Sequence, residues 1–164
     1  MSEIDIQKDA DALTLTITAR FTAPPERVWQ VWADPRKLEH WWGPPGFPAT
    51  FVDYELTAGA DIRYFMTSPE GERFHGWWRV LAVDEPRSLQ LEDGFADDAG
   101  HPNPDLPTTH MQVTLHPDDQ AGTRMVLITT FPSVEAMAQL EGMGMVEGIR
   151  LALEQIPAVL AASA

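Results

Sequence analysis

Tryptophan is concentrated in one short segment of this chain. Four of the six tryptophans lie between positions 29 and 42, in a stretch that Asp34-Pro35 interrupts and Gly43-Pro44 ends. Large amphipathic rings are costly to place near a surface unless they cover a core or line a cavity. The segment therefore predicts two short helices packed against the interior, and it makes a ligand cavity the first functional question.

The length of 164 residues suffices for one domain with a full core and is too short for two. We expect a single domain over residues 1–164, with residues 1–10 as a loosely ordered tail. The sequence contains no cysteine, no signal peptide pattern and no apolar run of about 20 residues. These features predict a cytoplasmic protein without disulfides or a membrane span.

Acidic side chains outnumber basic ones by 25 to 11, which gives a formal net charge of −14. Nucleic-acid affinity depends largely on Lys and Arg side chains that displace counterions, so DNA and RNA are poor partners for this chain. The charge either keeps the surface solvated or steers a basic partner or a cationic ligand toward it.

Alternation of apolar and polar residues predicts seven strands. The first runs from Leu13 to Phe21, and the last two surround Met111 and Met125. The other four are predicted at Thr50–Tyr54, Asp61–Thr67, Phe74–Val83 and Ser88–Glu92. Short turns favour antiparallel hairpins. A longer loop, from about Gly94 to Pro107, can form a lid over a pocket.

From Ser133 onward, apolar residues follow helical spacing and predict one long helix. Gly142, Gly144 and Gly148 interrupt it, and each costs about 1 kcal/mol relative to alanine. Either a strand passes close to these glycines or space is left open beside them. An antiparallel sheet with one long helix buries apolar surface best by wrapping around that helix. We therefore predict an α+β fold: a seven-stranded curved sheet around the C-terminal helix, with two short helices after the first strand.

Several motifs in this order resemble one known family. They include Ala23–Trp29, Trp41–Pro44, Val83–Leu89 and Gly144–Gly148. From about residue 10 to its end, the chain resembles the activator of heat-shock-protein ATPase homologue (AHSA-type) family of the START-like, or SRPBCC, superfamily. The resemblance implies a Bet v-like helix-grip fold with an apolar cavity between sheet and helix. The chaperone activators themselves carry a further N-terminal domain, which argues against that role here.

Aromatic and methionine side chains are the candidates for the cavity wall. In the strand around Trp77 and Trp78, neighbouring side chains point to opposite faces. The pattern favours Trp78 inward, although a bulge at Gly76 would exchange the two. Methionines add adaptable walls. The predicted ligand-binding residues are Trp42, Phe65, Phe74, Trp78, Phe95, Met111, Met137 and Met145.

Catalysis has weaker support in the sequence. The five histidines show no paired ligand spacing, so we expect no metal, and no dinucleotide or phosphate loop predicts a cofactor. No serine lies in a Gly-x-Ser-x-Gly elbow. If proton transfer occurs, the candidate groups are His75 or His110, together with Tyr64, Asp93 or Arg79.

The leading functional hypothesis is binding of a small hydrophobic molecule, lipid-like or aromatic, rather than catalysis. One alternative is a chaperone ATPase-activating interaction module that uses the acidic surface. The other is a cyclase or dehydratase acting on a polyketide-like substrate, which needs at least two polar groups aimed into the cavity. Exposed strands and an outward Trp77 would also allow a homodimer across a two-fold axis.

Overall fold

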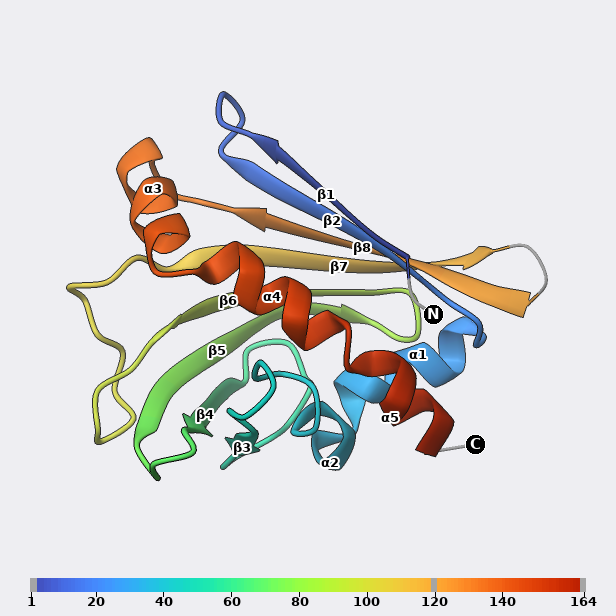
Figure 1. Ribbon diagram of the computed structural model, residues 1–164, viewed down its shortest axis with the longest axis horizontal. Coiled ribbons are helices and arrows are strands. Elements are labelled where there is room, and N and C mark those ends of the chain that lie inside the picture. Colours follow the sequence, from blue (N-terminus) through green and yellow to red (C-terminus); the bar gives the residue numbers. More distant parts are fainter. Residues whose placement is uncertain (1–2, 119–120, 163–164) are drawn as a thin grey trace.

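The computed structural model describes residues 3–118 and 121–162. Within them, eight strands form one antiparallel sheet in the order β1-β2-β8-β7-β6-β5-β4-β3 (Figure 1). The strands are β1 Glu3–Asp9, β2 Thr14–Phe21, β3 Ala49–Phe51, β4 Asp61–Thr67, β5 Arg73–Asp84, β6 Ser88–Phe95, β7 Thr109–Asp118 and β8 Gly122–Thr130. The helices pack against this sheet, so the predicted α+β helix-grip fold is confirmed.

The sheet has one strand more than the seven predicted, because part of the expected tail is ordered. Residues 3–9 form β1, which pairs with β2 in register from Glu3↔Arg20 to Asp9↔Thr14. Ile4 and Ile6 pack against the core from this strand. The prediction of a loose tail is therefore wrong for residues 3–9, and positions 1 and 2 lie outside the described residues.

The tryptophan-rich segment forms two short helices, as predicted. They are α1 Pro25–Ala33 and α2 Pro35–Leu38, and the Asp34 side chain caps α2 by accepting a hydrogen bond from the Arg36 amide at 2.9 Å. Trp29, Trp32 and Trp41 are fully buried. Trp41 Nε1 donates to the Val31 carbonyl at 2.8 Å, which fixes the chain after α2 against α1.

The C-terminal part is three helices, not the single long helix predicted. They are α3 Val134–Gly142, α4 Met145–Leu153 and α5 Ile156–Ala162. Gly144 separates the first two because its φ of +85° is a left-handed conformation that glycine adopts without strain. Pro157 is the second residue of α5, where a missing amide proton breaks no helical hydrogen bond. None of the described helices is long and apolar enough to cross a membrane.

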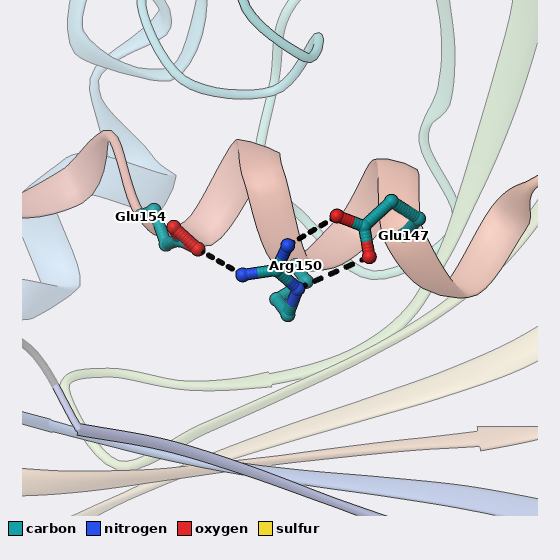
Figure 2. A network of polar contacts seen from close by, with 3 residues as sticks. All are labelled: Glu147, Arg150 and Glu154. Atoms are coloured by element: carbon teal, nitrogen blue, oxygen red, sulfur yellow. Dashed lines mark hydrogen bonds and ion pairs between the residues drawn. The ribbon is translucent and has the colours of Figure 1, made fainter.

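Helix α4 has a charged outer face and an apolar inner face. Arg150 forms ion pairs with Glu147 and Glu154, one helical turn away on either side (Figure 2). Such pairs at three- and four-residue spacing support a helix on its solvent side. By helical periodicity, Met145, Gly148, Ile149 and Ala152 lie on the opposite side, which faces the sheet. The sequence of α4 therefore directs small and apolar side chains toward the interior.

Candidate ligand-binding site

A cavity of about 270 Å³ lies between the sheet and helix α4. On the sheet side it is lined by inward residues of five strands, among them Tyr64, Gly76, Asp93, Met111, Leu127 and Thr129. On the helix side it is lined by Leu140, Gly144, Met145, Gly148, Ile149 and Ala152. Trp41, Trp42 and Pro44 close one wall, and Pro107 of the loop after β6 adds to another. The lining is mostly apolar.

Glycines leave this space open. A Cβ atom added at Gly144 or Gly148 would have no neighbour within 4 Å. The same holds at Gly142, which is exposed and does not line the cavity. Of the two sequence interpretations of these glycines, open space is therefore the one that the structure supports.

The cavity opens to solvent between the start of β5 and the turn from α3 to α4. Phe74 and Met143 line it and are 48% and 54% exposed, respectively. Large apolar side chains that are half exposed at the rim of a cavity mark a route by which an apolar molecule can enter.

Asp93 and Tyr64 form the polar end of the cavity. Leu89, Leu91 and Asp93 alternate along β6 and share its inner face, so the strand that supplies core leucines also directs this carboxyl inward. Tyr64 Oη donates a hydrogen bond to Asp93 Oδ1 at 2.9 Å. Asp93 is the one acidic residue among the described residues that line the cavity.

Burial raises the pKa of Asp93 to about 7, although the hydrogen bond from Tyr64 favours the ionised form. The indole of Trp78 also lowers this pKa, but its Nε1 makes no hydrogen bond of normal geometry. Burial, together with the charge of Asp93, raises the pKa of Tyr64 well above its ordinary value. Near neutral pH the site therefore contains a neutral phenol and a carboxyl group that can exist in either protonation state.

Gly76 allows Tyr64 to take this position. The two residues are directly paired between β4 and β5. A Cβ at position 76 would lie 2.4 Å from Tyr64 Cζ and 2.5 Å from its oxygen. Because any side chain here would displace the phenol ring, Gly76 is part of what holds Tyr64 against Asp93.

Two further polar atoms in the cavity wall lack partners. Trp42 Nε1 and Thr129 Oγ1 are buried and have no hydrogen-bond partner among the described residues. Buried polar groups are nearly always hydrogen-bonded, so such atoms beside a cavity indicate a place where a bound molecule can complete the bonding.

The family assignment rests on a sequence comparison. The model of the family described as Activator of Hsp90 ATPase homolog 1-like protein matches residues 22–161. The chain belongs to this family. The resemblance inferred from the tryptophan-rich segment and the later motifs is therefore confirmed.

Solved structures agree with membership of the Activator of Hsp90 ATPase homolog 1-like family. A solution NMR structure from Arthrobacter aurescens is 47% identical with a TM-score of 0.92, over 96% of this chain and 91% of that one. A crystal structure from Mycobacterium smegmatis is 48% identical with a TM-score of 0.88, over 96% and 97%. A crystal structure from Silicibacter pomeroyi, at 24% identity and a TM-score of 0.73 over 92% and 99%, supports the fold alone. The search of curated proteins finds no match.

In this family member, five of the eight predicted ligand-binding residues line the cavity: Trp42, Phe74, Phe95, Met111 and Met145. Trp78 points inward as predicted, and Gly76 pairs in register without a bulge, but Trp78 is fully buried behind Trp42. Met137 is buried in the core beside the cavity and is not part of its wall.

Phe65 was also predicted to line the cavity, but it lies on the other face of β4. Its ring packs against His75, and the guanidinium of Arg73 lies 4.3 Å from the ring centroid. Strand alternation explains the error, because Tyr64 and Met66, on either side of Phe65, are the residues that face inward.

The four predicted catalytic candidates do not converge. Tyr64 lines the cavity, and His75 lies at its edge with its ring against Phe65. His110 Nε2 is instead 3.2 Å from Gln90 Oε1, and Arg79 forms an exposed ion pair with Asp61. His110 and Arg79 therefore lie outside the site, which weakens the cyclase or dehydratase hypothesis.

Asp93 should make stability depend on pH. Its pKa is about 7 in the folded protein against an ordinary 3.8, so between these values the folded state holds a proton that the unfolded chain releases. The contribution of Asp93 to stability is therefore fully present below about pH 4 and is lost as pH rises to about 7. Over this range the free energy of unfolding should fall by at most about 1.4 kcal/mol per pH unit. Asp93→Asn removes this slope.

Urea unfolding of both proteins at a series of pH values measures the effect, because the difference between the two curves isolates Asp93 from all other acids. Parallel curves from about pH 4 to about pH 8 would show that the folded structure does not raise the pKa of this carboxyl group.

Proposed function

We propose that the protein binds a small, mainly apolar molecule, aromatic or lipid-like, between the sheet and helix α4. The observation that carries this proposal is an open, mostly apolar cavity whose wall includes the hydrogen-bonded pair Asp93 and Tyr64. Its volume of about 270 Å³ is close to the lower end of the range for small-molecule sites, about 300–1,000 Å³. A molecule of one or two rings, or a short chain, suits this space.

Apolar contact would supply most of the affinity. Each Å² of apolar surface removed from water contributes about 25 cal/mol before the losses of motion on binding are subtracted. Met66, Met111, Met143 and Met145 line the cavity with flexible, polarisable side chains. Because these four side chains can adapt, we expect the cavity to accept ligands of somewhat different shapes.

The polar groups would determine the orientation of the ligand. Asp93 and Tyr64 lie on the sheet side, whereas Gly148 and Ala152 provide an unobstructed apolar surface on α4. A ligand with one polar end and one apolar end therefore matches the distribution of groups in the wall, with its polar end at Asp93.

Thermal unfolding with a panel of one-ring, two-ring and short-chain compounds tests the proposal. A ligand at about 100 times its Kd should stabilise the protein by about 2.7 kcal/mol and raise Tm by about 5–10 °C. Native mass spectrometry should then show one bound molecule per chain. If no compound raises Tm and an experimental structure has side chains filling the cavity, the proposal is wrong.

The family description favours a second candidate function, stimulation of a chaperone ATPase. It predicts that the protein binds the chaperone and increases its ATP hydrolysis, with or without a molecule in the cavity. A pull-down combined with an ATPase assay separates the two functions. Absence of stimulation at saturating protein would remove this candidate and leave the ligand-binding proposal unaffected.

A further inference from the structure

The carboxyl group of Asp93 has no counter-charge in the cavity. Neither Lys nor Arg occurs among the described residues that line it. The titratable groups of the wall, besides Asp93, are Tyr64 on β4 and His75 on β5. His75 packs its ring against Phe65, on the face of the sheet away from Asp93. Ionised Asp93 is therefore a buried charge without a Lys or Arg partner in the part of the wall that the structure describes, which is a costly arrangement.

The groups around Asp93 stabilise its ionised form with dipoles only. Tyr64 donates to Oδ1 at 2.9 Å, and the indole of Trp78, paired with Asp93 between β5 and β6, lowers the pKa of the carboxyl group. Trp42 Nε1, also in the cavity wall, has no hydrogen bond of normal geometry among the described residues, and its indole lowers the pKa of Tyr64 rather than acting on Asp93. The Asp93 carboxylate therefore has a neutral hydrogen-bond donor beside it, in Tyr64, but no positive charge in the described wall.

Aromatic side chains form part of the wall of the same cavity. Trp42, Tyr64, Phe74 and Phe95 all line the cavity. The faces of such rings attract cations, and most strongly where water is excluded. The formal net charge of −14 acts in the same direction, because it raises the concentration of cations near the protein. The net charge of the chain and the aromatic residues of the wall thus both favour a positively charged ligand.

We propose that the polar end of the ligand is a protonated amine, which pairs with Asp93 while its apolar body lies along helix α4. This inference rests on the proposed ligand-binding function and adds the chemical class of the ligand. The ammonium group donates to the carboxylate and lies against the aromatic rings. Where Asp93 is protonated before binding, it releases that proton to solvent, and the ion pair holds the ligand.

Four probes with the same two-ring body test the proposal: 1-naphthylmethylamine, 1-naphthylmethanol, 1-methylnaphthalene and 1-naphthoic acid. They differ only in the group that would reach Asp93. Calorimetric titration at about pH 8 should give an amine affinity at least about tenfold higher than that of the alcohol or the hydrocarbon, with the acid weakest. In Asp93→Asn the amine should lose this advantage, while the hydrocarbon binds as before.

The pH dependence of binding to the wild-type protein provides a second test. Amine affinity should rise between about pH 5 and about pH 8, as Asp93 ionises, while hydrocarbon affinity changes little. Tyr64 stays neutral over this range, and any effect of His75 persists in Asp93→Asn.

The outcomes distinguish this inference from the proposed function. Equal or tighter binding of the alcohol, the hydrocarbon or the acid would overturn the amine inference and leave the apolar site in place. An amine affinity independent of both pH and Asp93 would overturn it as well. If none of the four probes binds, the amine inference fails, and the wider panel of one-ring and short-chain compounds decides the proposed function separately.

Discussion

Gly148→Leu should lower the affinity of the cavity for a two-ring ligand by about 100-fold, or about 2.8 kcal/mol. Gly148 lines the cavity from the middle of α4, and apart from its chain neighbours and the helix's own backbone no atom lies within 4 Å of the position that a Cβ would take there. A leucine side chain would therefore start in open space and occupy part of the cavity volume. Leucine also has a higher helix propensity than glycine, so the variant should fold at least as well as the wild type.

Gly142→Leu is the matched control. It makes the same change in the last residue of α3, where there is equal room for a Cβ, but Gly142 is exposed and does not line the cavity. Calorimetric titration with the tightest naphthalene probe should show wild-type affinity for Gly142→Leu and little or none for Gly148→Leu. Equal affinities in the two variants would place the ligand elsewhere on the protein.

Trp78→Ala should destabilise the fold by about 3–5 kcal/mol. Trp78 is completely buried and lies at the centre of an aromatic cluster. Its ring centroid lies between 4.8 and 6.4 Å from those of Trp32, Trp42, Phe51, Tyr54 and Tyr64. Removal of the indole would leave a large hole that rigid neighbouring rings cannot fill. The loss is a large part of the total stability of a domain, which is about 5–15 kcal/mol.

The neighbouring tryptophan on the same strand is the control for this substitution. Trp77 points to the outer face and is only partly buried, with its indole over Gly94. Trp77→Ala should therefore cost about 1 kcal/mol. Urea unfolding of the two variants measures both values. Equal destabilisation would contradict the assignment of Trp78 to the interior and Trp77 to the surface.

The elements with strong periodicity could be predicted from the sequence. Leu15, Ile17 and Phe21 alternate with polar residues, and all three are buried on one face of β2. The prolines and glycines around α1 and α2 marked where these helices begin and end. In such segments, local propensity and burial require the same structure, so the pattern alone is sufficient.

Elements stabilised by contacts far away in the chain could not be predicted in this way. Strand β1 has only Ile4 and Ile6 as apolar residues, and it is ordered because its backbone pairs with β2. The break at Gly144 depends on a left-handed backbone conformation. Glycine spacing indicated that something unusual occurs there, but not whether the helix continues.

The polar end of the site was predicted only in part. The sequence indicates Tyr64 and Asp93 as candidate groups, but it gives His75, His110 and Arg79 equal weight. The signal that separates them is strand alternation: Asp93 follows Leu89 and Leu91 on one face of β6, whereas His110 and Arg79 lie on outward positions. The pairing of Tyr64 with Gly76 requires the strand register, which the sequence alone does not provide.

The most direct test of this account is a crystal structure of the protein with the tightest-binding of the four naphthalene probes. We expect electron density for the two rings between Met111 of the sheet and Gly148 of α4, with the polar substituent within hydrogen-bond distance of Asp93. Density for the probe on the outer surface, or an interior in which side chains fill the cavity, would contradict the account.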